Sequence, residues 1–433
     1  MSRVKRIGSS RFAALAGTAI LLVSSWTAAK ADEVLDWNVV LFQIVLSEPA
    51  GANLATSIAT SRPAAIMHLA VFEAVNAIEG DYEPYLGTIT APAGASSRAA
   101  AAAAAHDVLR AFFVSPTNVA LLDTALAISL GAIPDGQGKD DGVAVGQAAA
   151  AAMVAARVGD GSAPPAFWVP PNSDPGEWQA TPSCPALGGV FFHWKNVTPF
   201  ALASTDQFRS DPPPQLTDNK YRKDFDEVKA LGRFDSPQRP QDRADVAILY
   251  RDLLGPQTWN PIARQVAAAE GTSLSENART FALLNMAIHD ALLAVQETKY
   301  HYRFWRPETA IRRAGEDGNP KTDPDPAWAP FIVTPCFPSY SSAHASAGGA
   351  ARKILERAFG AGGHDFTVSH PSQPISVHYT KFSQVTDDID DARIYGGIHF
   401  RFDQVAGARQ GRRVGSYIYK NFLRRVHDEG GRD

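Results

Sequence analysis

Three short clusters of basic, hydroxyl and imidazole side chains lie in the last third of this 433-residue chain, and together they could hold an anion. The first cluster places Lys299 and Arg306 seven residues apart among aromatic residues, with Pro307 directly after them. On a continuous helix this spacing puts both cations on one face, although Pro307 disfavours helical geometry at Arg306 and can instead begin the next helix. Alone, the pair is weak evidence, because two solvated cations with packed stems give the same pattern.

The second cluster is a proline-containing loop that starts at Phe337 and opens a predicted helix ending near Phe359. The first turn of a helix carries free backbone N–H groups and the positive end of the helix dipole, so it is suited to holding an anion. Ser342 could donate its hydroxyl group to such an anion and Ala343 its amide. The alternative interpretations are simple N-capping by Ser342 and a structural hydrogen bond from His344.

The third cluster begins at Arg393 and continues through a glycine pair to His399 and Asp403. Gly396-Gly397 predicts a bend, after which His399 and Asp403, four residues apart, share one face of the last helix. A carboxylate one turn away can accept a hydrogen bond from one imidazole nitrogen, which leaves the other nitrogen free to bind or attack. By itself, His399 is equally well interpreted as a histidine of the core.

In this order, the three clusters resemble the signature shared by the vanadium-dependent haloperoxidases and the acid phosphatases of the phosphatidic-acid-phosphatase type 2 superfamily. The residues that carry the resemblance are Lys299, Arg306 and Pro307, then Ser342, Ala343 and His344, then Arg393, His399 and Asp403. The resemblance extends over most of the chain after residue 31. It implies an oxyanion site in the C-terminal half.

The resemblance also implies a role for each position. Vanadate or phosphate would be bound by a set of six residues. This set consists of Lys299, Arg306, Ser342, Ala343, Arg393 and His399. His399 would be the axial ligand of the metal, His344 and Lys299 would take part in catalysis, and Asp403 would orient His399. Phe337 matches an aromatic residue that lines the halide side in chloroperoxidase-type members.

Three departures from the family pattern are visible. Ala392 stands where the third cluster has a serine, and Ala343 stands where the second cluster has a glycine. Neither change removes a charge or a ligand, although Ala343 adds a methyl group where the backbone must approach the anion. Gln296 takes the place of a tryptophan of the halide pocket, so halide preference cannot be transferred from the chloroperoxidase-type members.

The favoured function is therefore a vanadium-dependent haloperoxidase that uses hydrogen peroxide, halide and a small organic acceptor. The halide would leave as hypohalous acid from a histidine-bound vanadate. The first alternative is an acid phosphatase, in which His399 attacks phosphorus to form a phosphohistidine and His344 protonates the leaving alcohol. The second alternative is a non-catalytic exported helical protein that binds an oxyanion.

An internal repeat predicts how the chain positions these clusters. An apolar stripe at helical spacing, Met67, Val71, Ala74 and Ile78, recurs 217 residues later as Leu284, Ile288, Ala291 and Val295. In the same register Glu73 falls opposite Asp290. Serine pairs then open two further helices, 98–113 and 343–359. The first copy has Tyr82 in register with Lys299, so it is expected to be a scaffold.

The fold class expected from this repeat is all-α, with two four-helix-bundle-like units similar to vanadium chloroperoxidase. A Pro- and Trp-rich crossover, 161–214, joins the two copies. The predicted divisions are an export signal, 1–31; an N-terminal repeat with the crossover, 32–214; and a C-terminal repeat with the site, 215–433. Further helices are predicted at 143–157, 220–231, 242–254, 262–269, 277–295 and 398–423.

The N-terminus has four basic residues before an apolar run and small residues around residue 30, as an export signal does. A retained N-terminal anchor is the alternative. Cleavage after residue 31 would leave 36 Lys and Arg against 45 Asp and Glu, a net charge of −9. We therefore expect an exported, periplasmic or secreted protein with no nucleic-acid partner and no membrane span in the mature chain. A homo-oligomer is compatible with the sequence.

Export would place Cys184 and Cys336 in an oxidising compartment, where they could pair. The sequence leaves this disulfide open.

Overall fold

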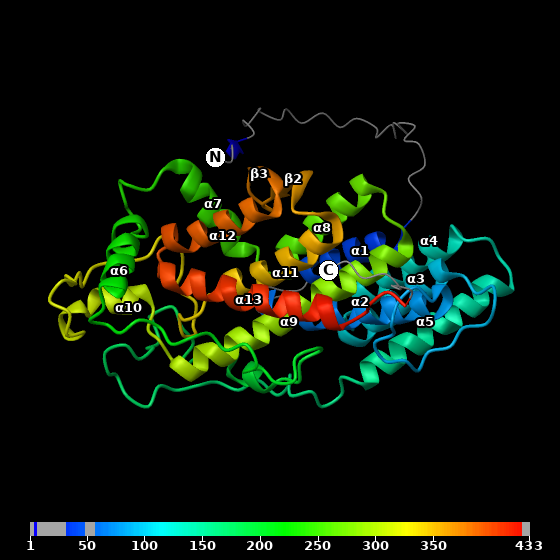
Figure 1. The fold of residues 1–433 in the computed structure, drawn as a ribbon, viewed down its shortest axis with the longest axis horizontal. Helices are drawn as coiled ribbons and strands as arrows, with labels where there is room; N and C mark the ends of the chain where they lie inside the picture. Colours follow the sequence, from blue (N-terminus) through cyan, green and yellow to red (C-terminus); the bar gives the residue numbers. More distant parts are fainter. Residues whose placement is uncertain (1–3, 7–31, 48–56, 427–433) are drawn as a thin grey trace.

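The computed structural model describes residues 4–6, 32–47 and 57–426. In this part of the chain nearly all regular structure is helical, as the repeat predicts (Figure 1). The first half contains α1 (Glu33–Ser47), α2 (Ser57–Glu79), α3 (Ser97–Phe112), α4 (Pro116–Gly131), α5 (Gln137–Ala155) and the short 3-10 helix η2 (Phe192–Asn196). The second half contains α6 (Asn219–Leu231), α7 (Gln241–Asp252), α8 (Pro256–Glu270), α9 (Leu274–Tyr302), α10 (Pro307–Arg312), η3 (Ala314–Glu316), α11 (Ala343–Phe359), α12 (Phe382–Tyr395) and α13 (Arg401–Asn421).

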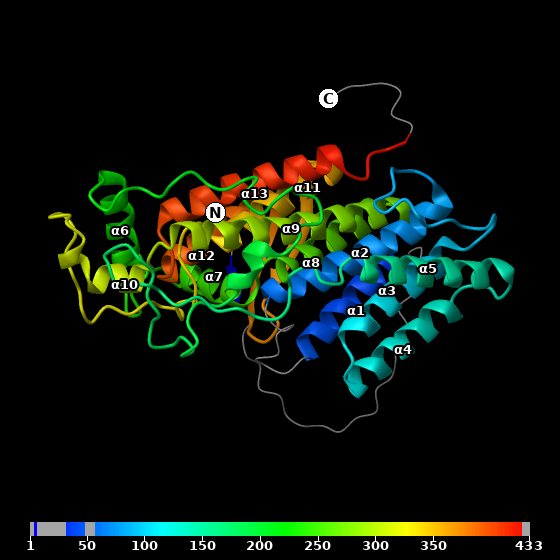
Figure 2. The ribbon, with the colours of Figure 1, turned by 90° about the horizontal axis from the view of Figure 1, so that it is seen from below.

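The helices form an elongated body in which α9 runs through the middle. Figures 1 and 2 both place α3, α4 and α5 at one end and α6 and α10 at the other, with α11 and α13 alongside α9. One apolar core runs from Val34 to Leu423 through both predicted repeats. A second, smaller core rich in aromatic residues lies at the end that contains α6 and α10, and it includes Tyr221, Trp305 and Phe400. The two copies are therefore packed together along their length.

The two repeat helices, α2 and α9, use their acidic residues in the same way. Glu73 of α2 accepts the backbone N–H of Tyr85 and those of the next two residues. Asp290 of α9 accepts the backbone N–H groups of Phe200 and the two residues after it. Each carboxylate thus anchors a loop, which gives the sequence register a structural basis.

A small sheet is the departure from a wholly helical chain. Strand β2 (Gly362–Ser369) pairs antiparallel with β3 (Ile375–Lys381), and β1 (Val4–Arg6) pairs with the other side of β3. The alternation of buried and exposed residues in β2 is regular, and it was not recognised in the sequence. The predicted export signal otherwise lies outside the described residues.

Helix α9 is also longer than predicted, because it begins at a capping box on Ser273 and continues to Tyr302. Its length and composition would allow it to cross a membrane, but 94% of its most apolar window is buried inside the protein. A helix enclosed to this extent has the surroundings of a central core helix. The first-half helices α1 and α4 were not predicted either, although Ser115 caps α4 directly before a proline.

The two repeats meet at a buried polar network. The Asn38 amide donates to Asn260 at 2.8 Å and lies 2.8 Å from Nε2 of His68, while Asn260 and Asn285 exchange hydrogen bonds. His68 and Asn285 occupy the same register position of the two repeats. Burial, with a smaller effect of the Arg264 charge, lowers the pKa of His68 to about 3.

This pKa predicts a pH-dependent contribution of His68 to stability. Below pH 6.5 the His68 ring takes up a proton in the unfolded chain but stays neutral in the folded protein. The free energy of unfolding is therefore fully retained above pH 6.5 and falls as the pH drops below 6.5. We expect the wild type to lose about 2 kcal/mol more than His68→Asn between pH 6.5 and about pH 5. Urea unfolding of both proteins across this range measures the difference. Parallel pH profiles would contradict the prediction.

Candidate functional site

Lys299 and Arg306 reach the site from two different helices. Helix α9 ends at Tyr302, and Arg303 adopts a left-handed conformation with φ 53° directly after it. Arg306 is the N-cap of α10, with Pro307 at the first helical position. Pro307 therefore starts a new helix, as the sequence allowed, and Lys299 and Arg306 do not share the face of one continuous helix. The turn between the helices still brings both cations to one place.

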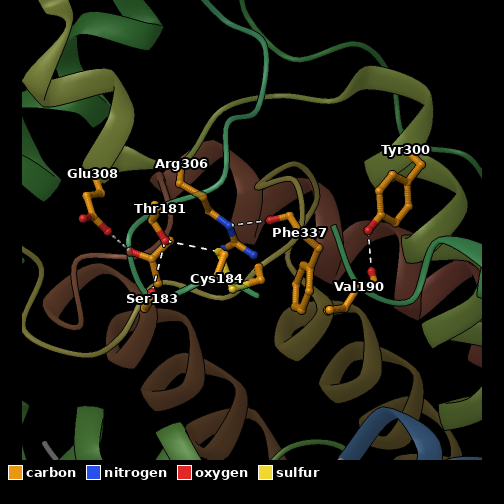
Figure 3. The surroundings of a disulfide bond; sticks show 10 residues. Thr181, Ser183, Cys184, Val190, Tyr300, Arg306, Glu308 and Phe337 are labelled. Carbon is orange, nitrogen blue, oxygen red and sulfur yellow. Dashed lines mark hydrogen bonds between the residues drawn. A yellow bond between two sulfur atoms is a disulfide. The ribbon is translucent and has the colours of Figure 1, made fainter. Parts of the chain in front are cut away.

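Both cations are fully buried and held by backbone carbonyl groups. The Lys299 ammonium donates to Pro338 O at 2.9 Å and Ser339 O at 2.7 Å. Arg306 donates to Phe337 O at 2.9 Å, drawn in Figure 3, and to Ile398 O at 2.9 Å. The two charged groups also lie 5.2 and 5.0 Å from the centre of the Phe337 ring. Phe337 thus lies directly against the site.

His399 and Asp403 form a hydrogen-bonded pair, but His399 is outside the last helix. Helix α13 begins at Arg401 with Phe400 as N-cap, so the expected shared helical face is wrong. The Asp403 carboxylate instead turns back, accepting the backbone N–H of Phe400 at 3.1 Å and lying 2.7 Å from Nδ1 of His399. A carboxylate in the first turn is stabilised there, and here it orients the imidazole.

Ser339 completes this pair and was not identified in the sequence. Its hydroxyl donates to Asp403 at 2.6 Å and lies 3.3 Å from Nδ1 of His399. Because Nδ1 faces the carboxylate, Nε2 of His399 is turned away from it and lies 3.0 Å from the Arg306 guanidinium. No local pattern marks Ser339, since its partner lies 64 residues further along the chain.

Arg393 and His344 share one backbone acceptor. Arg393, in the last turn of α12, donates to the carbonyl of Tyr250 at 2.8 Å. The same carbonyl is a hydrogen-bond partner of the His344 ring. Tyr250 lies near the end of α7, and its backbone role leaves no signal in the sequence. It connects the second and third clusters.

Ser342 and Ala343 lie where the sequence predicts, at the start of α11. Ser342 is the N-cap and accepts the N–H of Ala345 at 3.4 Å, as the capping interpretation expected. Its hydroxyl hydrogen stays available as a donor. A Cβ at Gly407 would come within 2.4 Å of Ser342 O, so glycine allows α13 to pack directly against this helix start. The close packing keeps both residues buried.

Several polar atoms at the site are buried without a hydrogen-bond partner among the described residues. They are Nη2 of Arg306, Nε of Arg393, Nε2 of His344 and Oδ1 of Asp403. Gln296, one turn before Lys299 on α9, is also fully buried with neither amide atom paired there. Such atoms are rare in folded proteins and costly. The unpaired nitrogens of Arg306 and Arg393 are donors, so they fit a guest that accepts hydrogen bonds, whereas Nε2 of the neutral His344 ring is an acceptor.

The lowered pKa values of the buried cations and of His399 also indicate a site for an anion. Burial, and then the charges of Arg306 and Arg393, lower the pKa of Lys299 well below its usual range. Burial lowers the pKa of Arg306 to about 9, and burial together with the Arg306 charge lowers the pKa of Arg393 to about 9. The pKa of His399 is also lowered well below 6.5, first by burial and then by Arg306, Lys299, Arg393 and His344. These five side chains therefore lie within electrostatic reach of one another, and an anion between them would relieve their repulsion.

Burial also shifts the pKa of Asp403 and of His344. Burial raises the pKa of Asp403 to about 6, against the opposing effects of Ser339 and the cations. The pKa of His344 is lowered well below 6.5, first by burial and then by Arg393. At neutral pH both site histidines are therefore unprotonated. A neutral imidazole is the form that binds a metal or attacks phosphorus.

A disulfide joins the crossover to the loop of the second cluster. Cys184 and Cys336 are bonded, with 5.3 Å between their Cα atoms. Cys336 directly precedes Phe337, and its carbonyl accepts the N–H of Val190 at 2.9 Å. Figure 3 shows the bond beside Arg306 and Phe337. The disulfide therefore anchors the loop to which both site cations are hydrogen-bonded.

Loss of this disulfide is expected to destabilise the protein. We expect Cys184→Ser with Cys336→Ser to lower the free energy of unfolding by about 2–5 kcal/mol, because the unfolded chain is no longer cross-linked. Urea unfolding without reductant measures the change. Ser183→Ala, in the same loop, is the control and should have almost no effect. Equal midpoints for the double variant and the wild type would refute this expectation.

The fold and the buried cluster of cations and histidines resemble those of vanadium haloperoxidases, and comparisons with known proteins show the same resemblance. Residues 279–428 match the family model of the VCPO second helical-bundle domain. Residues of this chain are 28% identical to vanadium chloroperoxidase of Curvularia inaequalis over 198 positions, 38% of this chain. The match spans 32% of that relative, about a third of its length.

Two solved structures have the same fold over nearly their whole length. The first bacterial vanadium-dependent iodoperoxidase superposes with a TM-score of 0.75 at 24% identity, covering 92% of this chain and 98% of that one. The holo-type bacterial vanadium-dependent chloroperoxidase superposes with a TM-score of 0.66 at 18% identity, covering 87% and 96%. The chain therefore has the fold of these vanadium haloperoxidases, and residues 279–428 resemble their second helical-bundle domain.

Proposed function

We propose that this protein is a vanadium-dependent haloperoxidase, which oxidises halide with hydrogen peroxide to hypohalous acid at a vanadate bound through His399. The observation that carries the proposal is the convergence of three buried cations and two neutral histidines around unpaired donor atoms. Bound vanadate would supply Lewis acidity without an electron carrier. The family relationship supports this chemistry.

The cations and hydrogen-bond donors of the site would hold the vanadate. Lys299, Arg306 and Arg393 would neutralise the oxygens of the anion, and the Ser342 hydroxyl and the Ala343 amide would donate to them. Nε2 of His399 would bind vanadium, because Asp403 occupies the Nδ1 side of the ring.

His344 would hold and move protons beside the anion. Its unpaired Nε2 is neutral in the free protein, so it can take up a proton and later return it. Lys299 would supply a fixed positive charge for catalysis, because the Pro338 and Ser339 carbonyls hold its ammonium group in place. Phe337 would form the apolar wall beside both cations.

The acid phosphatase and the non-catalytic oxyanion binder are the competing functions. Both enzymes would use His344 as an acid–base group, so its lowered pKa in the free protein favours neither of them. The non-catalytic binder would use the same cations without turnover.

One experiment separates the three functions. The purified protein, prepared without vanadate, is assayed with and without added orthovanadate for peroxide-dependent bromination and iodination and for aryl phosphate hydrolysis. Halogenation that requires vanadate is expected. Phosphate-ester hydrolysis inhibited by vanadate would indicate the phosphatase instead. Absence of both activities would refute both enzymes, and titration with vanadate would then show whether an oxyanion binds.

We also propose export to an oxidising compartment. The disulfide between Cys184 and Cys336 supports it, because such bonds persist outside the reducing cytosol. N-terminal sequencing of the protein from a native extract is expected to begin at Asp32. An intact N-terminus in the cytosolic fraction would contradict this.

A further inference from the structure

A hollow of about 440 Å³ lies between the start of α2 and the crossover, and we call it the crossover hollow. Its lining residues come from three segments of the chain: Ala59, Arg62 and Pro63; Ser162, Ala163 and 165–167; and Val190, Phe191, His193 and Trp194. Its lining includes three large aromatic residues, Phe167, Phe191 and Trp194. Its volume is in the range of small-molecule sites.

The polar side chains of the crossover hollow offer no free charge to a guest. Arg62 is paired with Asp160 at 2.7 Å and donates to Arg157 O. His193 accepts the backbone N–H of Ala166 at 3.1 Å, and burial lowers its pKa, so it is neutral. A charged guest would therefore lose its hydration without gaining a partner. The surface suits a neutral aromatic molecule, which can stack on or pack edge-on against the three rings.

The crossover hollow adjoins the oxyanion site through Phe191. The Phe191 ring packs edge-on against Trp194, with 6.1 Å between centroids, and at 6.4 Å against Phe337. Phe337 in turn lies against Lys299 and Arg306. One aromatic ring thus touches both the hollow and the wall of the site.

The backbone at Phe191 is held in an unusual conformation. Its φ is 60°, in the left-handed region that side chains such as phenylalanine rarely adopt. The preceding residue is fixed on both sides, since Val190 donates to Cys336 O and accepts from the Tyr300 hydroxyl (Figure 3). Such conformations persist where the surrounding structure imposes them, commonly at binding sites.

We propose that the crossover hollow binds the organic acceptor of the reaction, a neutral, electron-rich aromatic of one or two rings. This inference rests on the proposed function for its chemical purpose. The ring carbon would bond to the halogen of hypohalous acid as the halogen–oxygen bond breaks. The released hydroxide would take the ring proton and leave as water. The carbon is oxidised by two electrons, and the halogen is reduced by two.

A second hollow provides a matched control. It has a volume of about 580 Å³ and lies between α1 and α4, lined by residues such as Trp37, Leu121, Ala125 and Ile128. It is apolar as well, but none of its lining residues belongs to the oxyanion site. An aromatic molecule that merely prefers apolar surfaces would bind both hollows.

The test measures binding of 2-naphthol to protein free of vanadate and peroxide, by equilibrium dialysis. Ala166→Trp fills the crossover hollow, and Phe167→Ala removes a ring that is 40% exposed, so folding is little affected. We expect each variant to weaken binding at least tenfold. Ala125→Trp, which fills the second hollow, should leave the affinity unchanged.

Three results would overturn the proposal. The first is that the wild type does not detectably bind 2-naphthol, and the second is that Ala166→Trp and Phe167→Ala bind it as tightly as the wild type does. The third is that Ala125→Trp weakens the binding of 2-naphthol. Circular dichroism confirms that each variant is folded. Because this assay needs no vanadate, its outcome is separate from that of the halogenation assay. In the loaded enzyme, Ala166→Trp should also raise the KM for 2-naphthol at least tenfold.

Discussion

His399→Ala is expected to abolish peroxide-dependent halogenation while leaving the fold intact. The variant loses the imidazole nitrogen that would bind vanadium, and no neighbouring histidine can replace it, because His344 is held by Tyr250 from another helix. We expect a loss of at least a thousandfold in kcat/KM, about 4 kcal/mol of transition-state stabilisation. Steady-state bromination and titration with vanadate measure the loss.

The control for this prediction is His378→Ala. His378 lies in β3 with its side chain 53% exposed, so its removal tests the loss of an imidazole away from the site. It should retain wild-type activity. A His399→Ala protein that halogenates at the wild-type rate would end the haloperoxidase assignment.

Arg306→Lys is expected to lower activity at least a hundredfold, although it keeps the positive charge. The guanidinium of Arg306 contacts Phe337 O, Ile398 O and His399, and it has one further nitrogen unpaired. The compact ammonium group of lysine cannot make all of these contacts at once, because it lacks the planar shape and the five N–H donors of a guanidinium group. Each lost bond to a charged group costs about 1.5–3 kcal/mol. The affinity for vanadate should fall together with kcat/KM.

The matched control is Arg303→Lys, three residues earlier. Arg303 is 39% exposed and pairs with Glu177 at the surface, where lysine can replace arginine at little cost. Its activity should stay within twofold of the wild type. Equal, small effects of the two substitutions would show that Arg306 contributes only charge, and the proposed geometry of the site would be wrong.

The expected losses of activity in His399→Ala and Arg306→Lys both follow from a site in which buried cations lack a negatively charged partner. Lys299, Arg306 and Arg393 are buried near one another, with Asp403 as the nearby carboxylate of Lys299 and Arg306. Buried charges without partners destabilise a fold, so the free protein holds this arrangement at a cost. An oxyanion would supply the missing negative charge, and vanadate or phosphate should therefore raise the melting temperature of the wild type.

The residue types and their spacing selected the residues of the candidate site. The three clusters identified the cations and histidines, and the repeat register between Glu73 and Asp290 corresponds to matching loop anchors. Local signals also placed helix starts well, because Ser342 and Ser96 cap the helices that the sequence predicts. Local chemistry of this kind is encoded within a few residues.

Other features could not be predicted, because their partners are distant in the chain. Ser339 acts on Asp403 from 64 residues away, Tyr250 contributes a backbone carbonyl, and Phe191 is positioned by residues beyond the crossover. The expected helical face shared by His399 and Asp403 was wrong, because helix ends depend on the packing around them.

By itself, the sequence determined which side chains are available for oxyanion chemistry, the repeated helical pattern and the family that the chain resembles. Only the tertiary structure decided the pairing of Cys184 with Cys336, the direction in which His399 presents Nε2, and which buried donors lack partners. The physical reason is that identity and periodicity are local properties of a chain. Burial, hydrogen bonding and the resulting pKa depend on which distant segments pack together.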